Sequence, residues 1–284
     1  MSTLIYLNGK KVEYENAVVS VEDRGFQFAD GLYEVIYFYD GRAFYMDKHL
    51  ERLEKGAKEI YLDLDFEMEN LKKICRQAVR ESGFKNATAY IQVTRGMAPR
   101  SHAFPRQSSC TWIVTVKEVK RHPEEFYENG VKCITVPDER WERCNIKTIQ
   151  LLPNCIAKEK AKKAGCFEAI FHKGDCVTEG SSSNLFIVKG ETLYTHPANK
   201  RILNGITRQC LIEEITKELD IKCFEQTFTL DTLFDADEVF LTGTTTEIMP
   251  VVKIDGKIIG DGVPGSITNK IKSEFRNLTK TVDR

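Results

Sequence analysis

Two residues of this chain have the side chains needed for chemistry on an aldehyde. Lys147 lies in the sequence Arg-Cys-Asn-Ile-Lys-Thr, next to an apolar stretch, and Glu179 opens the serine-rich sequence Glu-Gly-Ser-Ser-Ser-Asn. A lysine amine can condense with an aldehyde, and a carboxylate can hold a proton on a ring nitrogen so that the ring accepts electrons. Either residue alone is better explained as a solvated charge. Together they indicate a cofactor that offers both groups, as pyridoxal 5'-phosphate does.

Two further segments suit the phosphate of such a cofactor. Gly205, Ile206 and Thr207 stand at the start of a predicted helix, where free backbone N–H groups and the helix dipole favour a dianion. The sequence Thr-Gly-Thr-Thr-Thr, centred on Thr244, is a hydroxyl-rich turn after a predicted buried strand. A helix cap and a polar turn are the ordinary explanations of these residues. Their occurrence with Lys147 and Glu179 favours a phosphate cradle.

In its motifs the chain resembles the class IV (fold type IV) pyridoxal-phosphate aminotransferases, and among them those that act on D-amino acids. The resemblance covers nearly the whole chain. The motifs that carry it are Glu-Asp-Arg-Gly-Phe-Gln-Phe (residues 22–28), Asp-Gly-Leu-Tyr-Glu-Val (30–35), His-Leu-Glu-Arg-Leu (49–53), Gln-Val-Thr-Arg-Gly (92–96), Pro-Arg-Ser-His (99–102), the Lys147 and Glu179 segments, and Asn-Gly-Ile-Thr-Arg (204–208).

The resemblance implies a two-domain α/β (α+β) fold with the active site in the cleft between the domains. It implies that Lys147 is the catalytic residue, which binds the cofactor covalently, and that Glu179 is the partner of the ring nitrogen. The cofactor-binding residues that it implies are Arg52, Lys147, Glu179, Leu203, Ile206, Thr207 and Thr244. It also implies a homodimer, because in this family the arginine-histidine loop reaches the neighbouring subunit.

Substrate choice depends on three residues that the resemblance assigns to the substrate α-carboxylate, Tyr33, Arg100 and His102. A phenol, a guanidinium and an imidazole together form a dense anion trap, although a lone loop histidine is more often solvent-facing. The arginine-histidine pair favours transamination of D-alanine and D-glutamate with 2-oxo acids. The alternatives are a branched-chain L-amino-acid aminotransferase, an aminodeoxychorismate lyase, and a non-catalytic module that retains the fold.

Several positions depart from the family pattern. Gly243 stands where a hydroxyl residue often occurs, so one phosphate contact is expected to be missing. Asn154 and Cys155 replace small residues, and Met97 and Ala98 replace the commoner small polar pair. None of these removes a catalytic group, so the expected effect is on side-chain specificity.

Composition limits the other function classes. The 284 residues are 42% apolar and 29% charged with a net charge of −1, which is ordinary for a globular protein and favours neither a nucleic acid nor a membrane as partner. No basic segment precedes an apolar core, and no apolar run approaches about 18 residues, so we expect no signal peptide and no membrane span. Nine scattered cysteines without a Cys-x-x-Cys pair argue against a disulfide framework or a metal site and for the cytoplasm.

The chain is long enough for two domains. We expect an N-terminal domain over residues 1–118, a linker over 119–123 and a C-terminal domain over 124–284 that carries the cofactor lysine. Asn8-Gly9 and Asp40-Gly41 predict two type I′ hairpins. Apolar spacing predicts strands at residues 4–7, 11–13, 33–39, 42–45, 88–94, 110–116, 131–136, 168–171, 184–188 and 238–241, and helices at 50–60, 71–79, 154–164, 206–218 and 267–278.

Overall fold

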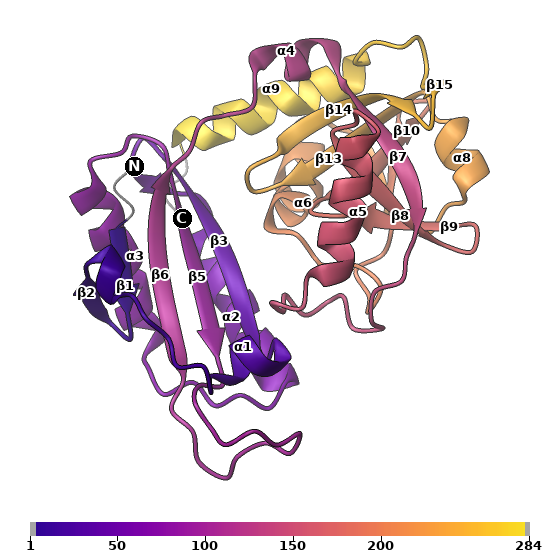
Figure 1. The fold of residues 1–284 in the computed structure, drawn as a ribbon. Helices are drawn as coiled ribbons and strands as arrows, with labels where there is room; N and C mark the ends of the chain where they lie inside the picture. The colour runs from indigo at the N-terminus through magenta and orange to yellow at the C-terminus, as the bar shows by residue number, and fades with distance from the viewer. Residues whose placement is uncertain (1–3, 282–284) are drawn as a thin grey trace. The chain divides into compact units, whose positions relative to one another are not determined.

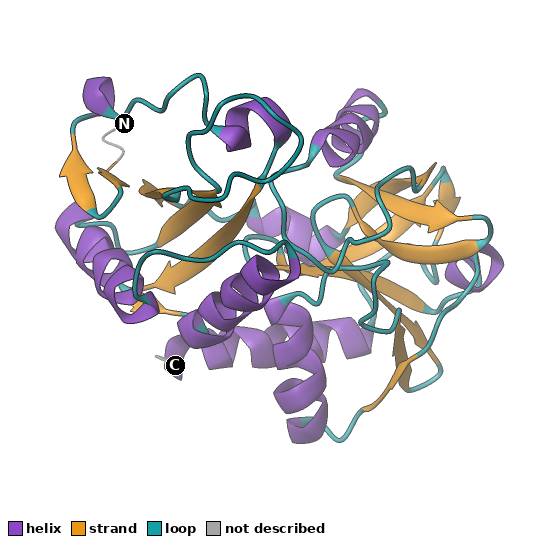
Figure 2. Ribbon diagram, turned by 90° about the horizontal axis from the view of Figure 1, so that it is seen from below, coloured by secondary structure: helices purple, strands orange, loops and turns teal. Residues whose placement is uncertain are grey.

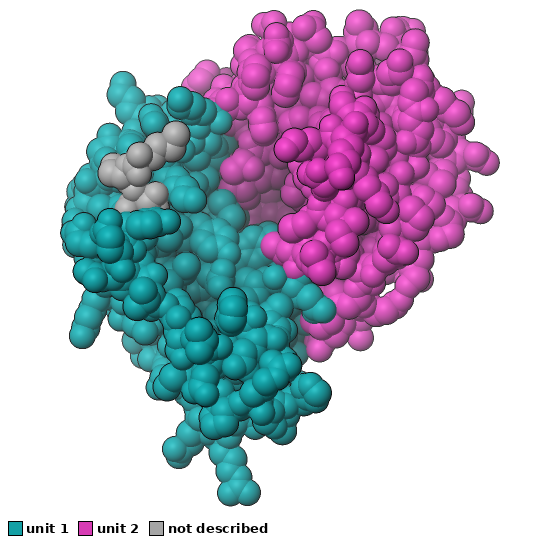
Figure 3. All heavy atoms as spheres, viewed as in Figure 1, with its two compact units in different colours: residues 1–120, 146–150, 281–284 teal, residues 121–145, 151–280 magenta. Residues whose placement is uncertain are grey.

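The computed structural model describes residues 4–281 and divides into two units, which Figure 3 colours separately. Of the described residues, unit 1 contains 4–120, Ile146–Gln150 and residue 281, and unit 2 contains Arg121–Asn145 and Leu151–Lys280. The expected division at residues 119–123 placed the cofactor lysine in the C-terminal domain. By its contacts, however, the short segment around Lys147 belongs to unit 1.

Unit 1 is built on an antiparallel sheet with the strand order β2-β1-β6-β5-β3-β4. Its strands are β1 (Leu4–Leu7), β2 (Lys10–Val12), β3 (Gly31–Tyr39), β4 (Arg42–Ala43), β5 (Ala87–Thr94) and β6 (Thr111–Glu118). Both predicted hairpins are confirmed. Asn8 and Gly9 have φ of 48° and 80°, and Asp40 and Gly41 have φ of 48° and 75°, as a type I′ turn requires.

Helices α2 (Met46–Glu59) and α3 (Met68–Ser82) confirm the two predicted N-terminal helices and lie along this sheet in Figure 1. Their apolar side chains, such as Leu53 and Leu71, are buried in one core with Ile91 of β5 and Val114 of β6. Unit 1 also contains a 3-10 turn (Tyr14–Asn16) and the short helix α1 (Arg24–Phe28).

The segment Ile146–Gln150 completes the edge of strand β3. The Tyr33 amide donates to the Lys147 carbonyl at 3.0 Å, and the Ile149 amide donates to the Gly31 carbonyl at 3.1 Å. Ile146 is buried in the core of unit 1. These backbone contacts and this apolar side chain explain why a segment flanked on both sides by unit 2 joins unit 1.

Unit 2 is built on a mixed sheet with the strand order β12-β11-β10-β13-β14-β7-β8-β9, and β15 pairs with β14. Strand β7 is parallel to β14 and β8, and β11 is parallel to β12. The strands are β7 (Val131–Pro137), β8 (Glu168–Lys173), β9 (Cys176–Gly180), β10 (Asn184–Lys189), β11 (Thr192–Thr195), β12 (Lys222–Glu225), β13 (Glu238–Gly243), β14 (Glu247–Ile254) and β15 (Lys257–Ile258). The sequence did not predict β9, β11, β12, β14 or β15.

The helices of unit 2 are α4 (Glu124–Asn129), α5 (Leu152–Lys163), α6 (Ile206–Cys210), a π-helical turn (Leu211–Ile215), α7 (Thr216–Glu218), α8 (Leu230–Phe234) and α9 (Ser266–Thr281). The helix predicted at residues 206–218 therefore exists with the predicted bounds but contains a π-helical turn. Both units contain helices and strands, the mixture expected of an α/β fold, and Figure 2 colours the two kinds of element separately. No helix within residues 4–281 is long and apolar enough to cross a membrane.

Candidate active site

Lys147 lies against strand β3, and its neighbour there is Tyr33. The Lys147 Nζ is 4.2 Å from the centroid of the Tyr33 ring, and the two backbones are hydrogen-bonded. Lys147 is only partly buried. The structure thus brings together the predicted cofactor lysine and one predicted substrate residue.

Arg52 belongs to a buried polar cluster next to this lysine. Its Nε and Nη2 donate to the two carboxylate oxygens of Glu34 at 2.7 and 2.8 Å, and His49 Nδ1 lies 2.8 Å from Glu34. Burial favours a higher pKa for Glu34, but Arg52 and His49 outweigh it and hold the pKa well below its usual range. Burial also lowers the pKa of His49, to which the charge of Lys147 contributes. Glu34 therefore orients the Arg52 guanidinium. The family resemblance implies that this guanidinium binds the cofactor phosphate.

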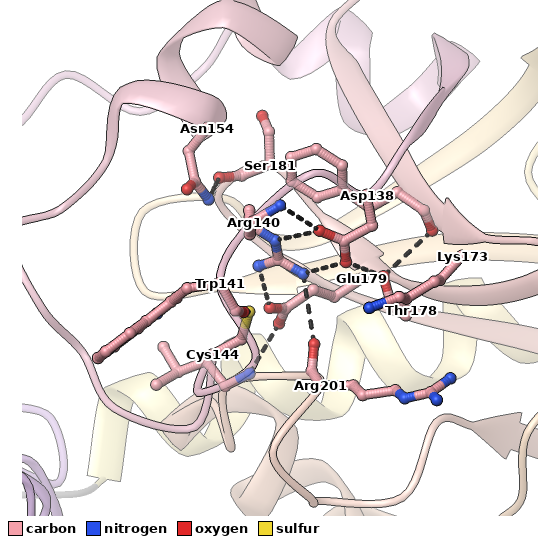
Figure 4. A network of polar contacts seen from close by, with 12 residues as sticks. Asp138, Arg140, Trp141, Cys144, Asn154, Lys173, Thr178, Glu179, Ser181 and Arg201 are labelled. Atoms are coloured by element: carbon pink, nitrogen blue, oxygen red, sulfur yellow. Dashed lines mark hydrogen bonds and ion pairs between the residues drawn. The ribbon is translucent and has the colours of Figure 1, made fainter.

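Glu179 is the centre of a second polar network, which lies in unit 2 and is drawn in Figure 4. Glu179 lies in the buried part of strand β9, and Arg140 Nη1 donates to one of its oxygens at 2.6 Å. The other oxygen accepts from Asn184 Nδ2 and from the Leu203 amide, both at 3.0 Å. Arg140 is itself held by Asp138, which also accepts from Thr178 at 3.0 Å. Every contact of the Glu179 carboxylate therefore fixes its orientation.

The charge of Glu179 reflects two opposed effects. Burial raises the pKa of the Glu179 carboxyl to about 7, although the Arg140 guanidinium beside it acts in the opposite direction. Burial also favours a higher pKa for Asp138, but its hydrogen bonds to Arg140 hold that pKa below the usual value. A buried carboxyl that titrates near neutrality is suited to share a proton with a heterocyclic nitrogen.

Asn184 connects Glu179 to the predicted phosphate cradle. Its Nδ2 donates to the Leu203 carbonyl at 2.7 Å as well as to Glu179, so the residues just before helix α6 are fixed to the glutamate. A Cβ at Gly205 would stand 2.2 Å from Asn184 Oδ1. This close approach explains the glycine, although its φ of −64° is open to any residue.

Apart from Arg52 of unit 1, the residues predicted to hold the phosphate lie on two adjacent elements of unit 2. Ile206 and Thr207 are buried at the start of α6, whose N-cap has no side-chain hydrogen bond, and α6 contacts β13. Thr244 is partly exposed in the turn after β13. Beside this turn, the buried Thr242 Oγ1 has no hydrogen-bond partner in the described part of the chain. Uncapped amides and an unpaired hydroxyl fit a phosphate, as Glu179 fits a ring nitrogen.

Arg100 and His102 lie in the exposed loop between β5 and β6 of unit 1, and both contact one ring. The Arg100 Cζ is 4.6 Å from the centroid of Phe28, and the His102 ring is 5.7 Å from it. No hydrogen bond, ion pair or ring contact joins either residue to Tyr33 within residues 4–281. Within one chain the structure therefore brings Arg100 and His102 together on Phe28, and it places Tyr33 beside Lys147.

Some of these residues were not predicted. Arg140, Asp138, Asn184 and Glu34 orient the predicted groups, and the only sequence signal for the first two is their position after strand β7. Of the departures noted above, Asn154 donates from Nδ2 to the Ser181 carbonyl at 2.9 Å and so supports the serine turn. Cys155 is exposed, and Gly243 lies in β13 with room for a side chain.

The chain matches known proteins over nearly its whole length. The family model for amino-transferase class IV matches residues 31–254. A D-alanine aminotransferase from Staphylococcus haemolyticus is 44% identical over 279 residues, which are 98% of this chain and 99% of that protein. A branched-chain amino acid aminotransferase from Escherichia coli superimposes with a TM-score of 0.91 at 27% identity, covering 97% of this chain and 94% of its own. The branched-chain enzyme from T.th., solved with pyridoxamine 5'-phosphate, has a TM-score of 0.91 at 27% identity, covering 99% and 95%.

Proposed function

Because the chain belongs to the class IV aminotransferases, we propose that it exchanges the amino group between D-amino acids, such as D-alanine and D-glutamate, and 2-oxo acids. The observation that carries the choice of substrate is the 44% identity with a D-alanine aminotransferase over 98% of the chain. The solved branched-chain enzymes share the fold at 27% identity, so the fold alone does not select the substrate. The Arg100–His102 pair is the second support.

The family is pyridoxal-phosphate-dependent, and the residues of this chain have separate tasks toward that group. When bound, the cofactor supplies an aldehyde that takes up the amino group and a ring that accepts the electron pair of the broken Cα–H bond. Glu179 holds the ring nitrogen and its proton. Ile206, Thr207 and Thr244, with Arg52, bind the phosphate, and Leu203 packs against the ring.

Lys147 does the acid-base work in this proposal. Its amine binds the cofactor between turnovers, and its Nζ takes the proton from the substrate Cα. Tyr33 lies beside this amine, so the tyrosine can orient the substrate while the lysine moves the proton. Arg100 and His102 bind the α-carboxylate, which fixes the face of Cα that meets Lys147.

We further propose that the active unit is a homodimer in the cytoplasm. Large apolar side chains are exposed at Val21, Phe26, Met97 and Phe104, on and near the arginine-histidine loop, and exposed apolar patches of this kind are typical of interfaces. Within the described part of one chain, no hydrogen bond, ion pair or ring contact joins Tyr33 to Arg100 or His102, which is compatible with a trap completed by a second subunit. All nine cysteines lie among the described residues and are free, as a reducing compartment favours.

The substrate choice is tested by comparing D- and L-alanine as amino donors to 2-oxoglutarate. We expect kcat/KM for D-alanine to exceed that for L-alanine by at least two orders of magnitude. Arg100→Ala should cost about 2 kcal/mol in kcat/KM for D-alanine, because it removes a charge-assisted contact to the carboxylate. It should also narrow the discrimination between the enantiomers. A wild-type preference for L-leucine would instead establish the branched-chain alternative.

A further inference from the structure

The loop that carries Arg100 and His102 requires an anchor. It connects β5 to β6 and extends beyond both strands in Figure 1, and the side chains of Arg100 and His102 are exposed. Ordering an exposed loop costs roughly 1–2 kcal/mol of backbone entropy for each residue. Binding a carboxylate with defined geometry therefore depends on contacts that hold the loop backbone.

Arg24 provides such contacts from helix α1. Its side chain is 3% exposed, and Nη1 donates to the Ser101 carbonyl at 2.6 Å and to the Ala103 carbonyl at 3.5 Å. Ser101 is the residue between Arg100 and His102. The Arg24 guanidinium also stacks on Phe28, with Cζ 4.7 Å from the ring centroid, and this is the ring that Arg100 and His102 contact.

Asp30 holds Arg24 in this position and shares a second arginine. Arg24 Nε donates to Asp30 Oδ2 at 2.8 Å, and Arg95 donates to both Asp30 oxygens at 2.8 and 3.1 Å. Arg95 also donates to the carbonyls of Ile60 and Tyr61, and its guanidinium lies 3.7 Å from the centroid of Phe104 in the loop. The cluster is therefore hydrogen-bonded to the backbone after helix α2 on one side. On the other side it contacts the loop, at the Ser101 and Ala103 carbonyls and at the Phe104 ring.

The charges of this cluster argue for a role beyond stability. Two nearly buried guanidiniums share one carboxylate, which leaves one excess positive charge beside the loop. Buried ion pairs contribute little net stability because desolvation offsets their attraction, so an apolar cluster would hold the fold as well. An arginine fork, in contrast, reaches a carboxylate and two carbonyls at once and specifies a loop conformation.

We propose that Arg24 and Asp30 are positioning residues for the substrate α-carboxylate, acting through the backbone of Arg100 and His102. This inference rests on the proposed function, because it assumes that Arg100 binds the carboxylate. It extends the substrate site to residues that never touch the substrate. Arg95 supports the same loop through Phe104.

The test is binding of propionate, a carboxylate without an amino group, measured as its inhibition constant against D-alanine. Arg24→Lys keeps a positive charge beside Asp30 but loses the guanidinium N–H groups that reach the loop carbonyls. We therefore expect the inhibition constant of propionate and the KM for D-alanine to rise about tenfold. The kcat and the cofactor affinity should change much less, since Lys147 and Glu179 are untouched. Arg106→Gln is the matched control, an exposed arginine of the same loop, and should leave all four quantities unchanged.

A combined variant distinguishes the two proposals. If Arg24 acts through the backbone of Arg100 and His102, then Arg24→Lys should add no further rise in a background that carries both Arg100→Ala and His102→Ala. A full additional rise in that background, or wild-type propionate binding in Arg24→Lys, would overturn the positioning role. If Arg100→Ala alone leaves propionate binding unchanged, Arg100 does not bind the carboxylate and the proposed trap is wrong. This outcome contradicts the proposed function, and it is distinct from the two outcomes that overturn the positioning role of Arg24.

A second variant is independent of the buried charges, in case Arg24→Lys does not fold. Phe104→Leu removes the ring on which Arg95 stacks, and Phe104 is exposed, so folding should tolerate the change. We expect a rise of about threefold in the propionate inhibition constant. Unchanged propionate binding in folded Phe104→Leu would contradict anchoring of the loop by this cluster.

Discussion

At the scale of single residues, the protonation of Glu179 determines the charge of the proposed ring-binding site. In the protein without cofactor, burial favours the neutral acid and raises the pKa to about 7. A raised native pKa means that its contribution to stability is fully present below the unfolded value of about 4.5 and is lost as the pH rises through about 7. Arg140 limits this effect but does not reverse it.

Glu179→Gln should therefore change the pH dependence of stability in the cofactor-free protein. Glutamine retains the shape and stays neutral. Between pH 4.5 and 7.5, the free energy of unfolding of the wild type should fall by about 3 kcal/mol relative to the variant, because a shift of one pKa unit corresponds to about 1.4 kcal/mol. Urea titrations across this range measure the difference. Parallel pH profiles for the two proteins would contradict a raised pKa for Glu179.

The role of Lys147 gives a second prediction at this scale. Borohydride reduction of the loaded enzyme followed by peptide mapping should place the cofactor on Lys147. Lys147→Ala should lose several orders of magnitude in kcat, since one amine both binds the cofactor and moves the proton. Lys200→Ala is a suitable control, because this lysine lies in an exposed turn of unit 2. A label on any other lysine would reject the assignment.

At the scale of elements, the sequence predicted the parts whose apolar pattern is regular. The hairpins at Asn8 and Asp40 were predictable because a two-residue turn with positive φ permits few residue types. Strand β14 was not predicted, since Pro250 and a polar start obscure its pattern, although it lies in the middle of the sheet. Strand β9 was not predicted, because it ends in Glu179 and Gly180, which resemble the residues of a turn.

The site was predictable only in part for a related reason. A motif identifies the residues that we propose to meet the cofactor, such as Lys147 and Glu179. It does not identify the residues that hold them, because Arg140 and Asn184 reach Glu179 from other strands and loops. Nor does any motif indicate that the segment around Lys147 pairs with β3, since that pairing depends on the free edge of a distant strand.

The start of helix α6 gives a prediction at this scale. Gly205→Ala should weaken cofactor binding at least tenfold, because its Cβ would displace Asn184, which is fixed to Glu179 and to the Leu203 carbonyl. Gly56→Ala is the matched control, because this glycine lies in helix α2 outside the proposed cradle and its Cβ would meet other atoms only at 3.4 Å or more. Equilibrium binding of pyridoxal phosphate to the cofactor-free variants measures the effect. Equal losses in both variants would mean that the close approach to Asn184 has no special importance.

At the scale of the whole molecule, the proposed homodimer is open to direct test. Sedimentation at assay concentration should show a dimer, and Phe26→Asp should shift it toward monomer with loss of activity, because a charge would replace an exposed apolar side chain near the loop. Tyr14→Asp is the control, since Tyr14 is also exposed but lies in the 3-10 turn. A monomer with full activity would defeat the dimer proposal.

The short segment Ile146–Gln150 makes unit 1 discontinuous along the chain. A polypeptide that ends at Lys120 would lack the backbone hydrogen-bond partners of Gly31 and Tyr33. It would also lack the Ile146 side chain, which is buried in the core of unit 1. During synthesis, the edge of β3 at Gly31 and Tyr33 therefore stays without these hydrogen bonds until residue 150 has left the ribosome. The same five residues contain Lys147, so a nascent chain cannot complete the fold of unit 1 without also placing this lysine beside Tyr33.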